Sequence, residues 1–292
     1  QYSSGWCTET VSRDVVASTQ KIVGLAQRGC PVDSTTAADI VRWLVKQEAA
    51  APGLPDVLCM ERFGWTSDMR GFLLGSRSFG QPVRFVPPGD GERGRAEGYR
   101  TKGALDGWVD GVWTRCKDQP AGLAILAMAC APLLSILDAP GFTIDIGGPP
   151  GTGKSAACKA ALSVCGDPER LGNQWAPNWA GVRGALECGH SVGVYLDDTK
   201  FLMGHWETAQ IAVYTVFDKF SQPLGQQGGG TRRRRPIRVV LLSTGESAIS
   251  EHCADAAGAA ARVLRLVLPP FATPAGAVEV HEHVEAHHVH VM

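Results

Sequence analysis

The residues best suited to chemistry form the segment Gly148-Pro149-Pro150-Gly151-Thr152-Gly153-Lys154-Ser155, a full match to the pattern GxxxxGK[ST]. An apolar run precedes the segment and an Ala-rich run follows it, which is the strand, loop and helix context that the pattern requires. The glycines would let backbone N–H groups surround a phosphate chain, and the helix N-terminus would add partial positive charge. We expect Lys154 to reach the β- and γ-phosphates of ATP, and the Ser155 hydroxyl to bind Mg²⁺.

A second apolar run, from Val192 to Leu196, ends in the two carboxylates Asp197 and Asp198. Because the carboxyl ends of strands in an open α/β sheet form the ligand crevice, we expect both acids to face the same nucleotide. Asp197 would hold Mg²⁺, and Asp198 would orient or deprotonate the attacking water. Many ATPases of this kind carry Glu at the second position, and the shorter Asp makes binding a firmer expectation than efficient hydrolysis.

A third apolar run, Ile237 to Ser243, is expected to lie between the phosphate-loop strand and the Asp197 strand. RecA-like and AAA+ motors insert a strand at this place, and a hydroxyl at its end senses the γ-phosphate. Ser243 and Thr244 are the candidates here, and Glu246 is a candidate cap for the next helix.

Four consecutive arginines, Arg232, Arg233, Arg234 and Arg235, lie in a Gly-rich loop before that strand. Guanidinium groups suit phosphates because they are planar, offer several donors and stay charged, so contact with nucleic acid is one interpretation. An arginine finger for a neighbouring subunit and a merely solvated loop are the alternatives. Arg262 and Arg265, beside the last strand, are further candidates for a finger or a sensor.

The pattern from residue 142 onward alternates strands with helices, which favours a parallel sheet covered on both faces. The sequence predicts strands at 142–146, 171–175, 192–196, 237–243 and 263–268, and helices near 154–164, 178–188, 206–219 and 246–258. The fold class is therefore α/β, with a RecA/AAA+-like P-loop NTPase core.

The chain divides into four regions by composition. Residues 1–88 read as a small α+β module with a helix over 13–27, a second helix ending near Pro52, and strands at 57–65 and 72–79. Residues 89–102 are rich in Gly, Pro and charge and read as a linker. The ATPase core is expected at 103–272, and the His-rich tail, 273–292, is expected to be loose or truncated, without a metal.

The overall composition sets further bounds. With 28 Lys+Arg against 29 Asp+Glu, the net charge is −1, which argues against a wholly basic nucleic-acid binder but not against a local basic patch. Nine cysteines without a CxxC pair favour a reduced, cytoplasmic compartment. The uncharged stretch 121–137 contains Pro132 and is short for a membrane span, so we expect a buried helix there. The sequence starts at Gln1, and we expect a fragment or a processed chain.

The order of motifs resembles domain-of-unknown-function family 927, proteins of bacteria, phages and mobile elements. The resemblance rests on Lys102-Gly103 with Trp108, the run Ala131-Pro132-Leu133-Leu134, the loop GGPPGTGKS, YLDDTK at 195–200, LLSTGE at 241–246 and ARVLRLVLPPF at 261–271. It implies an oligomeric, helicase-like ATPase, found near primase-like domains.

Together these observations predict a Mg²⁺-dependent ATPase that acts as a helicase-like or DNA-translocating motor in mobile-element or phage DNA replication. We expect ATP and Mg²⁺ as cofactors, single-stranded or forked DNA as a partner, and a homo-oligomeric ring, with a primase or other replication domain as a possible companion. Two alternatives use the same phosphate loop: a small-molecule kinase, and a nucleotide-dependent DNA-binding switch with little hydrolysis.

Overall fold

The computed structural model describes residues 10–51, 53, 57–220, 224–225, 231–232, 234–252, 257–267 and 269–290. The chain forms two units, residues 1–58 and 59–292. The boundary therefore lies at the start of the strands that the sequence places in the N-terminal module, and all of their residues after Leu58 belong with the second unit.

The first unit is built from short helices around a small core. Its elements are α1 (Arg13–Val16), α2 (Thr19–Ile22), the 3₁₀ helix η1 (Val23–Arg28) and α3 (Ala37–Ala50). The single helix expected over 13–27 is wrong, because Ser18 caps a new helix by accepting the Lys21 N–H, and Gly29 ends the 3₁₀ turn with φ 84°. Ile22, Val32 and Ala37 form the buried centre.

Short strands occupy the start of the second unit, where the sequence predicted two longer ones. They are β1 (Leu58–Met60), β2 (Gly64–Trp65), β3 (Gly71–Leu74), β4 (Arg77–Gly80) and β5 (Val83–Phe85). β2, β3 and β4 form an antiparallel sheet, and β1 pairs with β5. The run 72–79 is divided because Gly75, with φ 61°, makes the turn between β3 and β4.

The predicted linker is instead mainly a helix, α4 (Asp90–Gly98). Its Gly content gives it low helix propensity, so tertiary contacts must stabilise it. Arg95 donates to the Ala185 carbonyl at 3.1 Å and to Asn173 Oδ1 at 2.6 Å. Gly98 lies so close to Leu171 that a Cβ would come within 2.9 Å of its side chain. The segment is therefore part of the folded unit.

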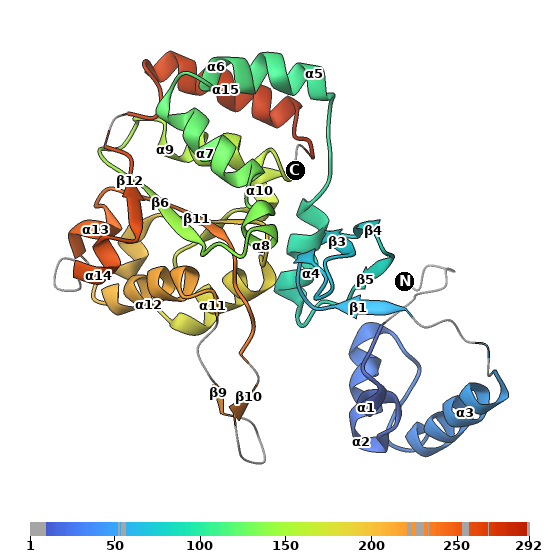
Figure 1. The fold of residues 1–292 in the computed structure, drawn as a ribbon. Helices are drawn as coiled ribbons and strands as arrows, with labels where there is room; N and C mark the ends of the chain where they lie inside the picture. The colour runs from blue at the N-terminus through green and yellow to red at the C-terminus, as the bar shows by residue number, and fades with distance from the viewer. Residues whose placement is uncertain are drawn as a thin grey trace. The chain divides into compact units, whose positions relative to one another are not determined.

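A five-stranded parallel sheet forms the centre of the second unit (Figure 1). The strand order is β12 (Val263–Arg265), β6 (Phe142–Gly147), β11 (Val240–Gly245), β8 (Gly193–Asp197) and β7 (Asn173–Gln174). The prediction that the third apolar run lies between the phosphate-loop strand and the acidic strand is confirmed, and so is the α/β fold class. The 171–175 strand is shorter than expected because residues 168–171 form a helical turn, α10 (Pro168–Leu171).

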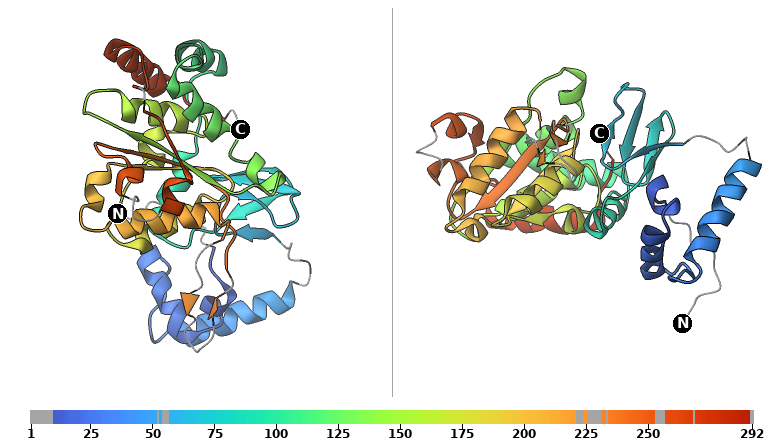
Figure 2. Two further views of the ribbon diagram at one scale, coloured as in Figure 1. Left: turned by 60° about the vertical axis from the view of Figure 1, so that its left-hand side comes forward. Right: turned by 90° about the horizontal axis from the view of Figure 1, so that it is seen from below.

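Helices cover both faces of this sheet (Figures 1 and 2). One face packs against α7 (Pro120–Ala129) and α9 (Lys154–Leu162), and the other against α11 (Trp179–Cys188) and α12 (Trp206–Phe217). The helix expected over 246–258 consists of α13 (Ile249–His252) and α14 (Ala257–Ala260), and residues 253–256 lie outside the described part. Short elements complete the unit: α8 (Leu133–Ile136), η3 (Thr199–Leu202), β9 (Leu224–Gly225) and β10 (Thr231–Arg232).

An outer layer on the α7 side contains the His-rich segment (Figure 1). It comprises α5 (Leu105–Trp108), the π-helical turn η2 (Val109–Trp113), α6 (Thr114–Cys116) and α15 (Pro274–Ala286). The expectation of a loose tail is therefore wrong, because Val280 and Val284 are buried and His287 Nδ1 accepts the Ala104 N–H at 3.2 Å. The backbone at His288 pairs with Lys102.

Two findings concern the described residues only. None of the helices seen there combines the length and apolarity that a membrane span requires. Within the same residues, no three His, Cys, Asp or Glu side chains gather in a way that could hold a metal ion.

Candidate nucleotide-binding site

The phosphate loop connects the end of β6 to the start of α9. Gly148, Gly151 and Gly153 have φ of 155°, 77° and 84°, conformations that side chains with a Cβ rarely adopt. The Thr152 hydroxyl donates to the Pro149 carbonyl at 3.0 Å and closes the turn. The loop therefore adopts the glycine-dependent curve that leaves backbone N–H groups and a helix N-terminus available to an anion.

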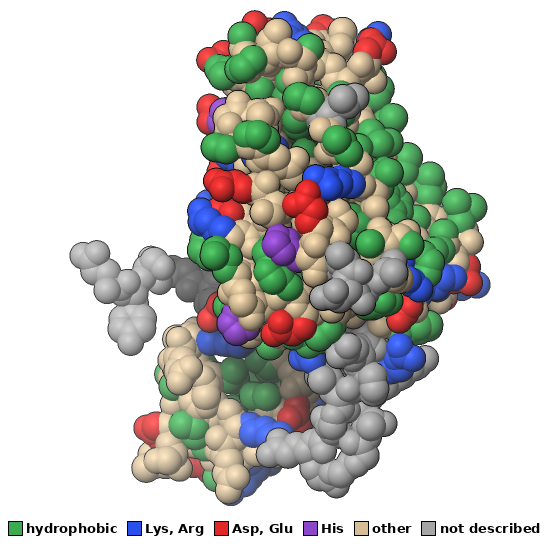
Figure 3. Space-filling model, turned by 90° about the vertical axis from the view of Figure 1, so that its left-hand side faces the viewer, with side chains coloured by type: hydrophobic (Ala, Val, Ile, Leu, Met, Phe, Trp, Pro, Cys, Tyr) green, Lys and Arg blue, Asp and Glu red, His purple; other side chains and the backbone are tan. Residues whose placement is uncertain are grey.

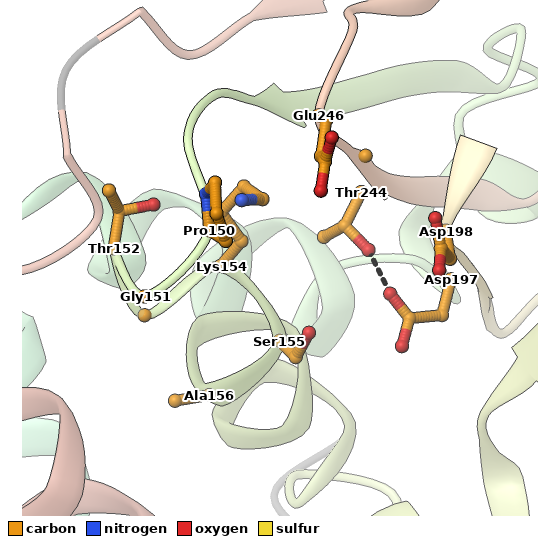
Figure 4. Close-up of a pocket in the computed structure, with 12 residues that line it drawn as sticks. Pro150, Gly151, Thr152, Lys154, Ser155, Ala156, Asp197, Asp198, Thr244 and Glu246 are labelled. Atoms are coloured by element: carbon orange, nitrogen blue, oxygen red, sulfur yellow. Dashed lines mark hydrogen bonds between the residues drawn. The ribbon is translucent and has the colours of Figure 1, made fainter. Parts of the chain in front are cut away.

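Lys154 begins α9 and folds back over this loop. Its Nζ donates to the carbonyls of Gly148 and Pro149, each at 2.7 Å. Both contacts are to neutral acceptors, which a phosphate anion would outcompete, because hydrogen bonds between charged partners are about twice as strong. Ser155 follows on the first turn of α9, and its hydroxyl points into the space between the loop and the acidic strand (Figure 4).

Asp197 stands at the carboxyl end of β8, across the pocket from Lys154 (Figure 4). Its Oδ1 accepts a short hydrogen bond from the Thr244 hydroxyl, and Thr244 Oγ1 lies 3.0 Å from the Tyr195 hydroxyl. Since Thr244 has one proton to donate and gives it to Asp197, Tyr195 donates to Thr244. Burial raises the pKa of Tyr195, which keeps the phenol protonated for this role.

Asp198 follows directly and has an unusual backbone for a non-glycine residue, with φ 63° and ψ 85°. Its Oδ1 accepts the Lys200 N–H at 3.2 Å, and Oδ2 forms an ion pair with Lys200 Nζ. The hydrogen bond to Asp198 is the main cause of a raised pKa at Lys200. Asp198 thus lines the pocket with its charge already partnered.

The two hydroxyl candidates on β11 lie on opposite faces of the sheet, because strand side chains alternate. Thr244 lines the pocket, together with Gly245 and Glu246. Ser243 is buried on the other face, where its Oγ accepts the Trp175 Nε1–H at 3.1 Å. The expectation that Glu246 caps the next helix is also not met: the first N–H of α13, at Ile249, is accepted by Asp145 instead.

The arginine candidates lie outside this pocket. Arg262 donates to the Gly258 carbonyl and stacks over Tyr214 and Phe217 of α12, with its guanidinium carbon 5.0 and 4.5 Å from the ring centroids. Arg265 pairs with Glu251 at 2.6 Å. Neither reaches the phosphate loop of its own chain.

The structure describes only part of the arginine-rich loop. Arg233 and the side chain of Arg232 lie outside the described part. Arg234 lies over the Phe220 ring at 5.3 Å, and Arg235 pairs with Glu61 at 2.6 Å. This loop leads into the amino end of β11, whereas the phosphate loop leaves the carboxyl end of β6. Because β6 and β11 are parallel, the two loops meet the sheet at opposite ends of its strands.

The pocket is lined by the phosphate loop, the first turn of α9 and the residues at the ends of β8 and β11. The cavity has a volume of about 380 Å³, within the usual range for ligand sites. Its lining residues are Pro150, Gly151, Thr152, Gly153, Lys154, Ser155, Ala156, Asp197, Asp198, Thr244, Gly245 and Glu246. A hydroxyl and a carboxylate that share such a cavity are oxygen donors of the kind that Mg²⁺ prefers, so the residues fit a Mg-nucleotide.

Several cysteines and histidines are buried away from this chemistry. Cys158 and Cys165 are both core residues with a raised pKa caused by burial, so their thiols stay neutral. His190 is buried beside Arg62 and Arg238, and burial, with help from these positive charges, lowers its pKa to about 3.

Sequence reasoning missed two supports of the site. Phe271 and Ala277 lie against Gly153, where an added Cβ would come within 2.8 and 2.9 Å of their side chains. The second support is Asp145, a carboxylate in an otherwise apolar strand. That break in the pattern was visible in the sequence, whereas nothing near Phe271 indicated contact with the phosphate loop.

Comparison with known proteins agrees with this fold. Residues 4–236 match the family described as "Domain of unknown function (DUF927)". Among solved structures, one titled "SCCmec type IV Cch - active helicase" is similar with a TM-score of 0.69 and 18% identity, covering 95% of this chain and 53% of that one. This chain thus spans about half the length of that helicase, and at such identity the likeness shows the fold alone.

Among the curated proteins, none has a sequence that matches this chain. The family match does not depend on them, since it runs from the first helices through the phosphate loop and the acidic strand. The chain therefore belongs to domain-of-unknown-function family 927.

Proposed function

We propose that this chain is a Mg²⁺-dependent P-loop ATPase that works as a helicase-like or DNA-translocating motor in mobile-element or phage DNA replication. The observation that carries the proposal is the shared pocket of the phosphate loop, Asp197, Asp198 and Thr244. The fold shared with the SCCmec type IV Cch helicase supports the motor assignment.

In the proposed reaction, the γ-phosphoryl group of ATP passes to water. Lys154 leaves the carbonyls of its own loop and binds the β- and γ-phosphates, beside the N–H groups of the glycine turn. Mg²⁺, held by Ser155 and Asp197, would neutralise charge on the transferring group. Thr244 keeps Asp197 oriented by donating its hydroxyl proton to that carboxylate, and Asp198 orients the attacking water.

The nucleic-acid part of the proposal assigns Arg232, Arg233, Arg234 and Arg235 to DNA phosphates. Arg262 and Arg265 are tied within their own chain, so a finger for the neighbouring site of a ring would need one of them to change partners. A primase or other replication domain stays a proposed companion.

The test is ATP turnover by the purified chain with and without single-stranded DNA. Turnover should rise with DNA and vanish in Lys154→Ala, while Lys159→Ala should retain it, because Lys159 lies on the same helix but pairs with Glu169. Turnover that depends on Lys154 but ignores DNA would contradict the motor and favour a kinase or another ATPase.

One observation favours a second candidate, a nucleotide-dependent DNA-binding switch with little hydrolysis. Asp198 is partnered by Lys200 and held in a left-handed conformation, so it is not free to act as a base in this arrangement. Tight ATP binding without turnover, even with DNA present, would support the switch.

A further inference from the structure

One buried carboxylate has no part in the proposed chemistry. Asp145 lies on β6, in register with Ser243 on one side and Arg265 on the other, and its exposed fraction is 0%. Oδ2 accepts the Ile249 N–H at 2.8 Å, and Oδ1 has no hydrogen-bond partner among the described atoms. Burying a carboxylate this way is costly, and hydrogen bonding from the first N–H of a four-residue helix and from the neighbouring Ser243 hydroxyl compensates only in part.

The Ile249 N–H that donates to Asp145 lies at the end of a short segment, Gly245 to Ile249, which begins with the last residue of β11. Gly148 N donates to the Gly245 carbonyl at 3.1 Å, which ties the segment to the phosphate loop. The Thr199 hydroxyl donates to the Ser247 carbonyl at 3.0 Å, which ties it to the turn after Asp198. Asp145 supplies the third tie, to the phosphate-loop strand.

Close packing leaves this segment little freedom. A Cβ on Gly245 would come within 1.8 Å of Thr199 Oγ1, and a Cβ on Gly147 would come within 3.0 Å of the Ala248 backbone. Thr244 immediately precedes the segment and Glu246 is part of it, and both line the pocket (Figure 4). A tie that fixes the segment therefore fixes the pocket wall formed by these two side chains.

We propose that Asp145 is a positioning residue for ATP hydrolysis, which holds the Gly245–Ile249 segment, and through it Thr244 and Glu246, against the phosphate loop. The inference rests on the proposed function, since it assigns a role in that reaction. Asp145 does not line the pocket. Its loss is expected to affect turnover far more than nucleotide affinity, which depends on the loop and on Lys154.

The test compares Asp145→Ala and Asp145→Asn with Thr143→Val in the full chain. Thr143 is the matched control, because it lies two residues earlier on the same face of β6, is also 0% exposed and has an unpartnered hydroxyl. Asp145→Ala should lower kcat by about 10- to 100-fold, in the range of other precisely oriented groups, and leave the Kd for a fluorescent ATP analogue within about threefold. Asp145→Asn keeps an oxygen that can accept from Ile249 and should restore most of kcat.

Amide hydrogen exchange measures how firmly Asp145 holds the Gly245–Ile249 segment, and it does not require ATP turnover. Asp145→Ala should speed exchange at residues 245–249, whereas Thr143→Val should not. If the wild-type chain hydrolyses no ATP, the proposed function fails and the exchange result alone decides the positioning. Unchanged kcat and exchange in Asp145→Ala, equal losses in Thr143→Val, or a Kd that rises as much as kcat falls would each overturn the inference.

Discussion

Thr244 links the acidic strand to the strand beside it through a short chain of hydroxyl groups. Tyr195 donates to Thr244, and Thr244 donates to Asp197. This arrangement fixes the rotamer of a carboxylate that would hold the metal, in the way that neighbours of ligating carboxylates commonly do. The neighbouring hydroxyl, at Ser243, has the same chemistry but faces Trp175 on the other side of the sheet.

A comparison of Thr244→Val with Ser243→Ala therefore distinguishes the role of a hydroxyl in the pocket from that of a hydroxyl in the core. Thr244→Val should lower ATP turnover by about tenfold or more and weaken the dependence on Mg²⁺, because Asp197 loses its donor; removing such a partner of a metal ligand typically costs about 10- to 100-fold. Ser243→Ala should leave turnover within about twofold while lowering the free energy of unfolding by about 1–3 kcal/mol, since the Trp175 N–H is left buried without an acceptor. Steady-state kinetics over a Mg²⁺ series and urea unfolding measure both. The reverse ranking in turnover would remove Thr244 from the site.

The charge of Asp145 also predicts a pH dependence of stability. Burial raises its pKa from 3.8 to about 6, opposed by hydrogen bonding from the Ile249 N–H and the Ser243 hydroxyl and by the charge of Arg265, while Glu251 adds to the rise. Because the folded state binds the proton more tightly than the unfolded state, this group lowers the free energy of unfolding as pH rises from about 4 to about 6. Asp145→Asn does not titrate. Its stability relative to wild type should therefore increase over this window, by at most about 3 kcal/mol.

Urea unfolding at pH 4, 5, 6 and 7 measures this difference. Asp138→Asn provides the contrast, because hydrogen bonding to Arg238, and the nearby Lys219, lower the pKa of Asp138. That group stabilises the fold above its unfolded pKa and loses the effect in acid, which is the opposite sign. A parallel pH profile for wild type and Asp145→Asn would show that Asp145 does not titrate in this range.

Among the elements, α15 has an effect on the site that its sequence did not indicate. The helix covers α9, and the segment leading into it places Phe271 against Gly153 of the phosphate loop. Phe271 is 3% exposed. The ring fills the space behind a glycine whose φ of 84° no other residue adopts readily, so it supports the loop from the side away from the pocket.

Phe271→Ala should leave a cavity behind the loop. The free energy of unfolding of the second unit should fall by about 3–5 kcal/mol, as for other buried Phe→Ala changes, and ATP affinity should fall as well because the loop loses its support. Val278→Ala on the same helix is the control, since Val278 is 57% exposed. Urea unfolding and titration with a fluorescent ATP analogue measure the two effects. Weakened stability with unchanged ATP affinity would limit α15 to a role in the fold.

The same elements show what the sequence could predict. The phosphate loop, the acidic strand and the strand between them were predictable because a local pattern specifies each one, and parallel crossovers leave few arrangements. The helix α4 was not, because its glycines disfavour a helix and only Arg95 and Gly98, through contacts with distant residues, stabilise one. Strand alternation could have separated Ser243 from Thr244, whereas the partner of Ile249 depends on packing between strands that the sequence does not reveal.

At the scale of the whole molecule, charge is balanced. The net charge is −1, and on the face shown in Figure 3 acidic and basic side chains are interspersed. Long-range attraction to DNA would therefore be weak, and the proposed binding would depend on local groups. Such local groups gather beside Arg235, at the end of the arginine-rich loop. Burial lowers the pKa of Arg62 there to about 10, and the positive charges of Arg235 and Arg238 lower it further.

Glu61 is the acid that partners Arg235 at this place, and a DNA phosphate would have to replace it. Glu61→Gln should tighten binding of single-stranded DNA by about two- to fivefold, the equivalent of an exposed ion pair. Arg235→Gln should weaken binding and make the slope of log K against log salt shallower by about 0.7, one phosphate contact. Glu97→Gln, which breaks a similar exposed pair with Arg170, should change neither. Because a shift in total charge would act equally in both Glu→Gln variants, only a difference between them assigns the DNA contact to this loop, and equal affinities would place it elsewhere.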